Sequence, residues 1–455
     1  MQAAPAPPPF AEPAAAPAAA ADSSATARGQ ALHALLTELY PLPRSLTGDG
    51  VRQTLQLLQE RLLPGLLVHE VPSGTRVLDW TVPAEWRLRD AYVATAAGQR
   101  VIDWQAHNLH VLGYSQPVQG WLTLDELRPH FYSLPTQPEL IPYRTSYYHP
   151  NWGFCLTQNQ LEALDEPLYE VCIDSELDPA GSLSYGELLL PGAVADEVLI
   201  SCHVCHPSLA NDNLSGLVVA AQLAAELSRR PHRLSYRFLF VPGTIGSITW
   251  LSRQTPQSLA RIRYGLVATL LGGPGGFCYK RTRRGLADID RVVAYVLSAG
   301  GYAHELRDFV PYGYDERQYC SPGFDLPVGC LSRTPHGEFA EYHTSADNCA
   351  FVRPEQLAES LDLYQRVVQV LEGNQRYRNL QPYGEPQLGR RGLYGAVKGQ
   401  GNPREVEMAL LWLLSYADGQ HDLLAIAERS RLPFAVLRHA ADQLLAADLL
   451  APVDT

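Results

Sequence analysis

Between residues 168 and 385 short apolar runs alternate with helical stretches, and this alternation constrains the fold more than any other feature of the chain. EVLISC (197–202) and RFLFVPG (237–243) have the length and composition of buried strands, whereas GLVVAAQLAAELSRR (216–230) between them has the pattern of a helix. YGLVATLLGG (264–273) is a further strand candidate. A strand followed by a helix and another strand is the unit from which parallel sheets are built. The sequence therefore predicts an α/β domain with a mainly parallel sheet.

The N-terminal region divides into an Ala/Pro-rich stretch and two helical patterns. Residues 1–28 lack a basic start and are repeatedly broken by proline, so we expect a disordered tail rather than a signal peptide. Residues 29–73 hold two helical patterns around a turn, and Thr47 or Asp49 is placed to cap the second helix.

Two further segments differ from the α/β region in composition and residue pattern. Residues 74–165 are rich in Trp, Tyr, Pro and short β-like runs, which predicts a small β-rich insert. Residues 389–455 return to helical patterns, with three helices followed by the short run LAPV. We therefore expect an α/β domain made of residues 29–73 and 166–388, interrupted by the insert and followed by a helical C-terminal domain.

Composition limits the classes of function. A formal net charge of −12 argues against a general nucleic-acid-binding surface. The cysteines are scattered without the spacing of a short-chain disulfide framework, which indicates reduced thiols. No uninterrupted apolar run is long enough to span a bilayer. Together these features predict a cytoplasmic protein with no membrane partner.

The segment SCHVCHPSLANDNLSG (201–216) lies between a predicted strand and a predicted helix. It is therefore a loop at the carboxyl end of a strand, which is the edge at which open α/β sheets bind ligands. His203, His206 and Asp212 offer imidazole nitrogens and a carboxylate there, and both suit zinc. The alternative is a polar loop in which the two histidines form local hydrogen bonds and Asp212 caps the helix. The residues alone leave both interpretations open.

Cys202 and Cys205 give the same loop a C-x-x-C spacing, which occurs in zinc sites. The chain has no second cysteine pair at a matching distance. If Cys202 lies within the strand, alternation directs its side chain and that of His203 to opposite faces. We therefore expect neither thiol to be a principal ligand. Nucleophilic catalysis by a cysteine would need a histidine partner and an oxyanion hole, which the sequence does not display.

A second polar segment, residues 313–348, ends in HTSADN and favours the metal interpretation. At this point the chain resembles the aminopeptidase-like proteins of uncharacterised function that are related to zinc-dependent exopeptidases with two co-catalytic metals. The resemblance covers nearly the whole chain after the tail. The motifs that carry it are RSLTGDGVRQTL (44–55), DWTVPAEWRLRDAY (79–92), HNLHVLGYSQPV (107–118), IPYRTSYYHPNWGFC (141–155), CHPSLANDNLSG (205–216), PGTIGSITWL (242–251) and DERQYCSPGFDLPV (315–328).

The resemblance implies a layout, a cofactor and a set of metal ligands. The layout is a zinc-exopeptidase-like mixed sheet flanked by helices, with a small β-rich insert and a C-terminal winged helix-turn-helix domain. In the related exopeptidases a strand-end histidine binds one zinc ion, an aspartate bridges two, and a late histidine binds the second. His203, Asp212 and His343 occupy these places here, which implies one or two zinc ions. His206 is a candidate substitute ligand, or a residue that supports the ligands.

Two positions depart from the pattern of the resembled family. The exopeptidases use a glutamate as general base where this chain has Gly243. A further acidic ligand is implied within LLGGPGGF (270–277), which contains no carboxylate. Asp315 and Glu316 are nearby candidates in the sequence to replace it. An enzyme that lacks its base loses about 10²–10⁴ in rate.

Residues for substrate recognition are less constrained. Arg317 in DERQYC can hold a substrate carboxylate in a bidentate pair, or it can form an internal salt bridge to Asp315 or Glu341. Tyr319 in the same motif is a second candidate for substrate binding. The aromatic side chains of residues 74–165 either line a pocket or pack the core of the insert.

The C-terminal helices resemble a winged helix-turn-helix, in which the second helix of the motif enters the major groove in DNA-binding versions. The candidate recognition helix PFAVLRHAADQLL (433–445) has only Arg438 and His439 as basic residues, with Asp442 opposing them. Its Leu and Ala content favours packing on another domain or a second subunit. We therefore expect a protein partner or a homo-oligomer rather than DNA.

Three classes of function follow. The first is a zinc-dependent aminopeptidase-like hydrolase that uses metal-activated water to cleave an amino-terminal peptide bond or a related small amide bond. Its substrate would be a small peptide or an aminoacyl-type compound. The second is a catalytically impaired relative that binds a ligand or partner through the same cleft, because Gly243 replaces the base. The third is a DNA-binding regulator, which the scarcity of basic residues on the recognition helix disfavours.

Overall fold

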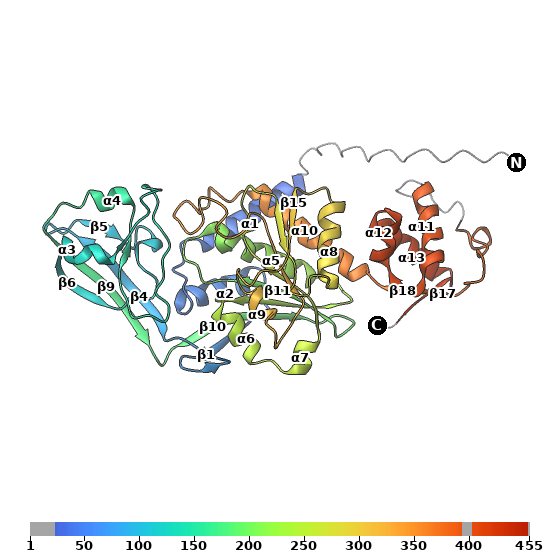
Figure 1. Ribbon diagram of the computed structural model, residues 1–455, viewed down its shortest axis with the longest axis horizontal. Helices are drawn as coiled ribbons and strands as arrows, with labels where there is room; N and C mark the ends of the chain where they lie inside the picture. Colours follow the sequence, from blue (N-terminus) through green and yellow to red (C-terminus); the bar gives the residue numbers. More distant parts are fainter. Residues whose placement is uncertain (1–22, 394–402, 454–455) are drawn as a thin grey trace.

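The computed structural model describes residues 23–393 and 403–453. An insert domain, a central α/β domain and a helical C-terminal domain follow one another along the long axis of the molecule (Figure 1). Most of the predicted tail, residues 1–22, lies outside the described residues. The prediction is wrong for residues 23–28, because helix α1 spans Ser23–Leu39.

The central domain is built on an eight-stranded mixed sheet, which confirms the predicted fold class. The strand order is β1-β10-β12-β11-β13-β16-β14-β15, and β12, β11, β13 and β16 run parallel to one another. The strands predicted from the apolar runs at 197–202, 237–243 and 264–273 are the neighbours β11, β12 and β13. The strands span β1 (Leu67–Pro72), β10 (Ser182–Leu190), β11 (Glu197–His203), β12 (Ser235–Val241), β13 (Ile262–Ala268), β14 (Phe277–Lys280), β15 (His304–Arg307) and β16 (Val328–Ser332).

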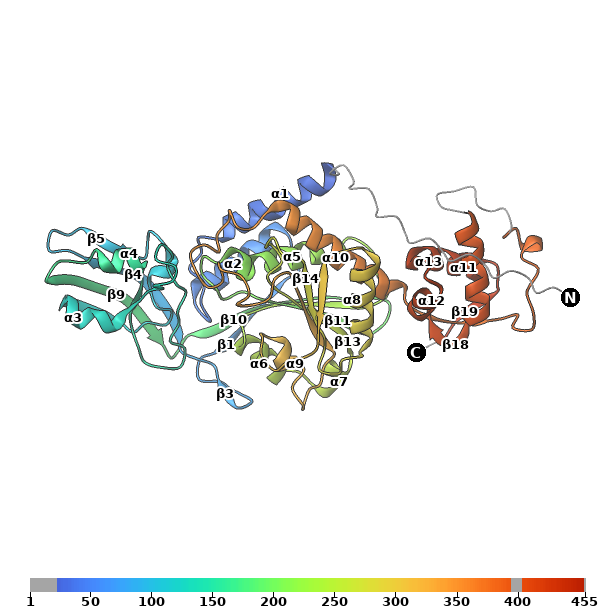
Figure 2. The same cartoon turned by 45° about the horizontal axis from the view of Figure 1, so that its top comes forward.

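Helices cover both faces of this sheet (Figure 2). Side chains alternate across β11, so Ile200 and Cys202 pack with one set of helices while Leu199 packs with the other. The first set is α1, α2 (Asp49–Arg61), α5 (Gly216–Leu227), α8 (Asp288–Ala299) and α10 (Pro354–Gly373), and the second is α6 (Ile245–Ser252), α7 (Pro256–Ala260) and α9 (Glu316–Tyr319). None of the helices in the described residues combines the length and apolar composition needed to cross a bilayer.

The insert domain has its own four-stranded antiparallel sheet, in the order β5-β4-β9-β6. The predicted end of the insert at residue 165 is wrong, because β9 pairs with β4 and β6 rather than with the central sheet. The pattern within a strand does not reveal which sheet the strand joins. The elements are β2 (Arg76–Val77), β3 (Trp80–Thr81), β4 (Glu85–Ala94), β5 (Arg100–Asp103), β6 (Val118–Thr123), β7 (Phe131–Tyr132), β8 (Phe154–Cys155), β9 (Leu168–Asp178), α3 (Leu124–Leu127), α4 (Gln158–Glu162) and the 3₁₀ turns Asn108–His110 and Arg128–His130.

The C-terminal domain combines three helices with a three-stranded sheet, as a winged helix requires. The predicted start at residue 389 is wrong, because β17 pairs with β18 and β19 of this domain. A four-residue strand that precedes a loop gives no sequence signal of the domain it joins. The elements are β17 (Arg376–Asn379), the 3₁₀ turn Gly389–Arg391, α11 (Pro403–Tyr416), β18 (Asp418–Asp422), α12 (Leu423–Ser430), α13 (Phe434–Ala446) and β19 (Leu450–Pro452).

The loop before α2 joins the central domain to the insert. Neither Thr47 nor Asp49 caps α2, whose N-cap residue is Gly48. The Thr47 hydroxyl instead lies 2.7 Å from the Tyr114 hydroxyl and accepts a hydrogen bond from the backbone N–H of Trp86 at 3.0 Å. Thr47 therefore ties this loop to the insert rather than starting the helix.

A buried ion pair strengthens the same junction. The carboxylate of Glu85 accepts hydrogen bonds from Arg52 Nη1 at 2.8 Å, Arg52 Nη2 at 2.6 Å and the backbone N–H of Ser182 at 2.8 Å. Arg87 Nε lies 3.0 Å from the same carboxylate. Burial alone would raise the pKa of Glu85, but the hydrogen bonds from Arg52 and Ser182 outweigh burial and lower the pKa to about 2.

Replacement of Glu85 by Gln is expected to destabilise the protein, because Arg52 then loses its buried carboxylate partner and keeps only its contacts with the more exposed Asp49 and Glu70. Removing one partner of a buried pair costs about 3–5 kcal/mol, and since Arg52 is 29% exposed we expect about 2–3 kcal/mol at neutral pH. The folded-state pKa lies below the unfolded one, so this stabilisation is present above about pH 4.5 and is lost as the pH falls toward about 2. Urea denaturation as a function of pH measures both effects. The exposed-site variant Glu60→Gln is the control, and equal stability of Glu85→Gln and wild type at neutral pH would contradict the prediction.

Candidate metal centre

The parallel strands deliver loops from distant parts of the sequence to one edge of the sheet. β11 ends at His203, and residues 204–216 lead from it into α5 through the irregular turn Ala210–Ser215. Gly243 follows β12, and the loop that holds His343 follows β16. Because the carboxyl ends of neighbouring parallel strands meet at the same edge, these loops gather around residues 204–216.

Asp212 lies at the centre of this group. Its side chain is fully buried, and its Oδ1 lies 2.9 Å from His203 Nε2. Its Oδ2 lies 3.0 Å from His343 Nε2 and 3.3 Å from His206 Nδ1. The ligand atoms of His203, His206 and Asp212 all lie within 4.8 Å of one another. The structure thus brings together the three histidines and the aspartate that the sequence singles out. Asp212 does not cap α5, whose N-cap residue is Ser215.

The protonation states of the group suit a metal ion. Burial would raise the pKa of Asp212, but the neighbouring histidines, with His206 first, hold it well below its usual range. Burial lowers the pKa of His203 to about 3, which keeps its imidazole neutral. Zinc takes carboxylate and neutral imidazole as ligands. Asp212 and His203 are therefore already in the form that a zinc ion requires.

The spacing of the group fits zinc as well. Ligand atoms at about 2.0–2.2 Å from a tetrahedral zinc ion lie roughly 3.3–3.5 Å apart. The contacts around Asp212, at 2.9, 3.0 and 3.3 Å, are slightly shorter, so a small outward movement of the imidazoles would admit an ion. The two oxygens of Asp212 face different histidines, Oδ1 facing His203 and Oδ2 facing His343 and His206, so both oxygens would be available to hold metal.

Asp347 fixes the backbone of the loop that carries Asp212. Its carboxylate accepts hydrogen bonds from the backbone N–H groups of Asn211 at 2.6 Å and Asp212 at 2.9 Å. Asp347 is itself fully buried, and burial raises its pKa to about 7. On the other side of the group, Arg44 Nε donates to the backbone carbonyl of His206 at 2.9 Å. These bonds hold the ligand-bearing backbone at both ends of the loop.

The insert domain also reaches this group. The ring of Tyr143 lies edge-on at 5.0 Å from the ring of His206 and 5.1 Å from the ring of His343. Its backbone N–H donates to the carbonyl of His343 at 2.8 Å. Ile102 and Val171, by contrast, pack in a hydrophobic core, while Trp86 stacks on Tyr114 and lines a neighbouring cavity. Aromatic residues of the insert therefore contribute both to the site and to the cavity beside it.

Tyr314 fills the space beside Gly243. A Cβ atom on Gly243 would lie 2.0 Å from Cε1 of the Tyr314 ring. This ring lies 3.9 Å from the ring of His203, and its hydroxyl is 3.4 Å from His206 Nε2. His336 stacks on Tyr314 at 5.8 Å. Neither Tyr314 nor His336 was predicted from the sequence, because residue spacing does not show that a ring from a distant loop occupies the room of a missing side chain.

Asp315 and Glu316 do not join the group of ligand atoms. Asp315 is fully buried, and its Oδ1 accepts a hydrogen bond from Ser247 Oγ at 2.7 Å, while its Oδ2 has no partner among the described residues. Burial raises the pKa of Asp315 to about 7. Glu316 pairs with Lys280 and accepts from the backbone N–H of Tyr314. In this arrangement neither residue supplies the acidic ligand that the resemblance implies.

The two residues predicted to bind substrate lie apart from the group. Arg317 is exposed, and within the described residues no ion pair joins it to Asp315 or Glu341. Tyr319 is fully buried with its hydroxyl 2.8 Å from Ser201 Oγ, which leaves it no surface for a substrate. The motif DERQYC forms the short helix α9, but its sequence does not fix the direction of each side chain.

The two cysteines of the loop are also outside the group. Cys202 packs in the hydrophobic core that it shares with α5. Cys205 Sγ lies 3.4 Å from the Tyr314 hydroxyl, and burial raises the pKa of this thiol to about 12. Because the thiolate is the nucleophile and the metal ligand, a protonated Cys205 does neither task.

Two cavities open beside the group, between the central and insert domains. One, of about 300 Å³, is lined by the loop before α2, by β4 and by Tyr143 and Tyr147. The other, of about 240 Å³, is lined by Gly243, Tyr147 and the aromatic pair Trp80 and Tyr148. Since Tyr147 lines both, the two cavities are adjacent.

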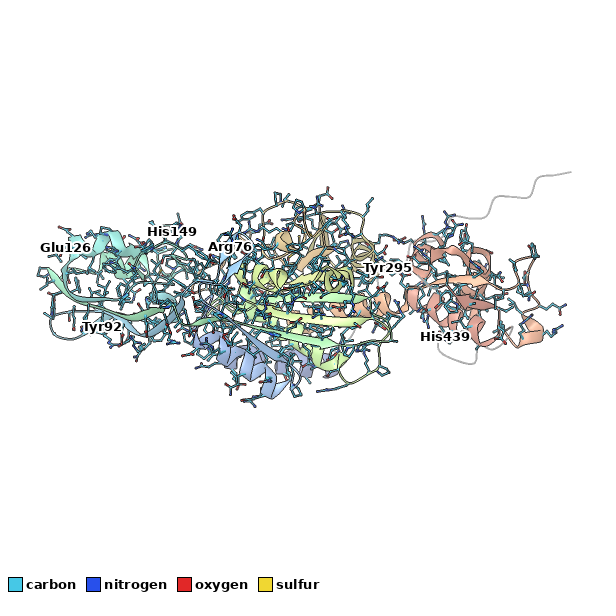
Figure 3. All side chains as sticks on the ribbon, turned by 90° about the horizontal axis from the view of Figure 1, so that it is seen from below. Arg76, Tyr92, Glu126, His149, Tyr295 and His439 are labelled. Carbon is cyan, nitrogen blue, oxygen red and sulfur yellow. The ribbon has the colours of Figure 1, made fainter. Side chains whose placement is uncertain are left out.

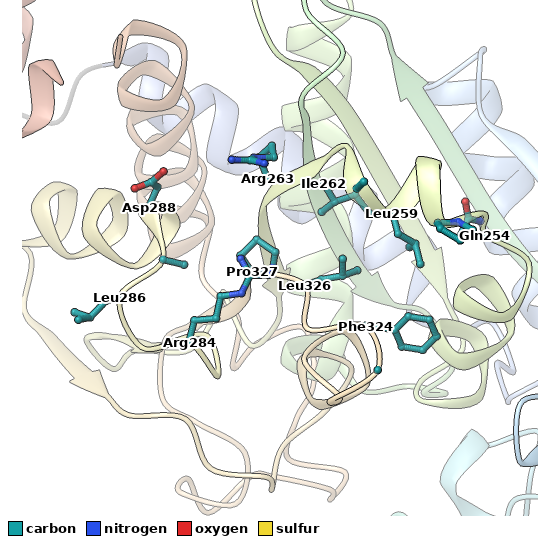
Figure 4. Close-up of a pocket in the computed structure, with 14 residues that line it drawn as sticks. Gln254, Leu259, Ile262, Arg263, Arg284, Leu286, Asp288, Phe324, Leu326 and Pro327 are labelled. Carbon is teal, nitrogen blue, oxygen red and sulfur yellow. The ribbon is translucent and has the colours of Figure 1, made fainter. Parts of the chain in front are cut away.

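A larger cavity, of about 760 Å³, lies at the opposite edge of the sheet (Figure 4). Ile262, the first residue of β13, and Pro327, which precedes β16, line it together with Arg263 and Arg284. The amino ends of these strands are remote from the loops that hold Asp212, so this cavity is not part of the candidate centre.

Families of known proteins match both the central and the C-terminal parts of the chain. A family described as a domain of unknown function (DUF4910) matches residues 33–374, and a winged helix-turn-helix family matches residues 375–452. The boundary between them falls just before β17, in agreement with the strand pairing. A Clostridium acetobutylicum protein, named as a candidate polysaccharide biosynthesis protein with aminopeptidase-like domain, is 47% identical over 422 residues, which are 93% of this chain and 96% of that protein.

Solved structures of the same architecture exist. The crystal structure of a candidate peptidase from Clostridium acetobutylicum has a TM-score of 0.89 and 46% identity, over 94% of this chain and 98% of that chain. A zinc aminopeptidase from Bacillus subtilis has a TM-score of 0.54 and 12% identity, over 76% of this chain and 95% of that chain. At such low identity the second likeness shows a shared fold and nothing further.

Replacement of Asp347 by Asn is expected to lower the affinity for zinc about 10–100-fold without removing a ligand. The amide has one acceptor oxygen for the two backbone N–H groups of Asn211 and Asp212, so the loop loses part of its support. Competition with a chromophoric zinc chelator measures the change. Asp362→Asn, which alters a partly exposed carboxylate of α10 that is bonded to Arg366 and Tyr302, is the matched control. An unchanged affinity in Asp347→Asn would contradict this role.

Proposed function

This chain belongs to the DUF4910 family of aminopeptidase-like proteins with a C-terminal winged helix, and on that premise we propose that it is a zinc-dependent hydrolase of an amino-terminal peptide bond or a related small amide bond. The observation that carries the proposal is the buried carboxylate of Asp212, whose two oxygens face His203 and His343 respectively. This group stands at the ligand-binding edge of the sheet, beside two cavities large enough for amino-acid-sized groups.

Each residue of the group has a distinct task in this proposal. His203, Asp212 and His343 would hold one or two zinc ions, with His206 as a further ligand. Zinc supplies a Lewis acid that polarises a carbonyl and lowers the pKa of a bound water. Burial raises the pKa of Tyr314 well above its usual value, so this hydroxyl keeps its proton and can donate to an oxygen that gains negative charge.

The proposed reaction needs a base that removes a proton from water, and the site has no carboxylate at the expected position. Gly243 offers no acceptor, and Tyr314 occupies its surroundings. We assign the task to Asp315, which follows Tyr314 and has an oxygen without a partner among the described residues. Its pKa of about 7 is suited to a base at neutral pH. A replacement base in a less favourable position leaves a deficit of up to about 10²–10⁴ in rate, so we expect slow turnover.

Ligand binding without turnover is the second candidate function. It is favoured by the position of the Tyr314 ring, which occupies the room that a side chain at position 243 would need. In this case the cleft between the central and insert domains keeps its metal ligands and binds an aminoacyl or peptide ligand without hydrolysing it.

We further propose that the winged-helix domain contacts protein rather than DNA. The backbone N–H of Phe434, at the start of α13, donates to the Tyr295 hydroxyl of α8 at 2.9 Å, and Figure 3 places Tyr295 at the junction of the two domains. In DNA-binding helix-turn-helix proteins the N-terminal residues of this helix contact base edges, whereas here they face the central domain. Arg438 donates hydrogen bonds to Tyr377 and Asp442, so its guanidinium group is already paired within the protein.

Protein purified without chelator is expected to carry about one or two zinc ions per chain, measured by elemental mass spectrometry. His343→Ala is expected to lose a substantial part of this zinc, and Asp212→Asn nearly all, because the Asp212 carboxylate contacts every other member of the group. His149→Ala, which changes an exposed histidine of the insert, is the matched control and should retain full zinc content. Wild-type protein without metal, even after zinc is added, would refute the hydrolase.

Substitutions at positions 243 and 314 distinguish the two candidate functions. Gly243→Glu alone is expected to disturb the site, because its Cβ would overlap the Tyr314 ring. The double variant Gly243→Glu/Tyr314→Ala makes room for the carboxylate, and hydrolysis of an aminoacyl p-nitroanilide is expected to rise over wild type. The rise is expected to be smaller than the roughly 10²–10⁴-fold that a base contributes, because the donor hydroxyl of Tyr314 is lost as well. Tyr314→Ala alone makes room without adding a base and should show no increase. A zinc-loaded double variant without turnover, together with inactive wild type, would favour the binding function.

A further inference from the structure

Arg44 is a buried cation that no carboxylate of the described residues neutralises. It is 2% exposed. Its Nε donates to the carbonyl of His206 at 2.9 Å and its Nη1 to the carbonyl of Leu39 at 2.6 Å, with a longer contact of 3.5 Å to Thr54 Oγ1. Its Nη2 has no hydrogen-bond partner within the part of the chain that the structure describes. A buried charge that faces only neutral groups is costly, so an anion at this place would be stabilising.

Arg44 lines the cavity of about 300 Å³ between the central and insert domains. The other arginines of its lining are already paired, Arg87 with Asp178 and Arg89 with Asp174. Aromatic side chains form much of the remaining wall: Trp86, Trp104, Tyr143 and Tyr147. Among the described residues that line this cavity, Arg44 is thus the cation with an unused donor and no anionic partner.

The same cavity borders the candidate metal centre. Pro207 lines it and directly follows His206, whose carbonyl accepts the hydrogen bond from Arg44. Tyr143 lines it too, and the ring of Tyr143 contacts the rings of His206 and His343. A ligand in this cavity therefore lies beside Arg44 and next to residues that adjoin or contact the candidate metal ligands.

We propose that Arg44 binds the carboxylate of a short peptide-like substrate whose amino-terminal bond lies at the histidine group. This inference rests on the proposed function and specifies its substrate class, which is a dipeptide or another aminoacyl amino acid with a free carboxylate. A cavity of about 300 Å³ is at the lower end of the range for small-molecule sites, which suits a ligand of this size.

The donors of the cavity match a carboxylate better than a phosphate. Nη2 of a guanidinium carries two N–H groups, and with Nε and Nη1 in use Arg44 can no longer form a two-nitrogen fork. It can hold one oxygen, and the hydroxyls of Ser45 and Tyr147 lie in the same lining for the other. A phosphate monoester presents three terminal oxygens and more charge, which requires further cations. Arg317, the arginine predicted from the sequence, is exposed and does not line this cavity.

The test compares two ligands that differ only in the charge of one end. Isothermal titration calorimetry of the zinc-loaded protein measures the affinity for a non-hydrolysable dipeptide analogue, a 3-amino-2-hydroxyacyl-leucine, and for the same compound ending in leucinamide. Because a charge-assisted hydrogen bond is about twice as strong as a neutral one, wild type is expected to bind the carboxylate at least about tenfold more tightly. Arg44→Met is expected to remove this preference, and the matched variant Arg317→Met to retain it.

Equal affinities of wild type for the two compounds, no binding of either, or displacement of the carboxylate analogue by inorganic phosphate far more readily than by acetate would each overturn the proposal. If Arg44→Met does not fold, the affinities of wild type for the carboxylate and amide compounds still test the proposal. Turnover separates this inference from the proposed function. A carboxylate preference without hydrolysis of any dipeptide would refute the hydrolase and retain the subsite, whereas equal hydrolysis of dipeptides and dipeptide amides would refute the subsite alone.

Discussion

The buried carboxylate of Asp212 is the constraint on which the rest of the site depends. An anion that is withdrawn from water needs donors or cations around it, and His203, His206 and His343 converge on this one. His203 ends β11 and His206 lies in the loop that follows it, but His343 has to arrive from the loop after β16. The parallel run of β11, β13 and β16 makes this meeting possible, since it places the carboxyl ends of these strands at one edge. The sheet topology and the charge at the centre of the site are thus parts of one arrangement.

The insert domain closes the side of this site that the sheet leaves open. Tyr143 reaches from the insert to the backbone of His343. The insert is held at that distance by Thr47, in the loop before α2, which contacts Tyr114, and by Arg52 of α2, which pairs with Glu85. The same loop carries Arg44, which is bonded to the backbone of the metal-ligand loop. A shift of the insert would therefore change the shape of the cavity and the support of the ligands together. The cavity and the candidate metal ligands therefore belong to one region, where the insert domain meets the central domain.

How much of this could be predicted from the sequence depended on how far apart the interacting residues lie along the chain. β11, the ligand loop and α5 are contiguous, so the apolar pattern located the strand end and with it His203 and Asp212. His343 was predicted through the family resemblance, because no spacing links it to that loop. The strands β9 and β17 were assigned to the wrong domains, because the residue pattern of a strand does not show which other strand it pairs with. The directions of Arg317 and Tyr319 depend on how α9 packs, which a short motif does not encode.

The missing side chain at Gly243 has to be considered together with Tyr314, because the Tyr314 ring occupies the space that a side chain at position 243 would fill. A glycine in place of a glutamate, with nothing else changed, would leave a void beside His203, and voids destabilise by roughly 24 cal/mol per Å³. The Tyr314 ring fills that space and contacts the His203 ring at 3.9 Å. The imidazole is therefore held against Asp212 by packing, without the missing carboxylate. A buried aspartate surrounded by three histidines is costly to assemble in the absence of a cation, and a bound metal ion would offset that cost. Because this group is packed in place while position 243 carries no carboxylate, the geometry supports the proposed metal site more strongly than it supports rapid catalysis.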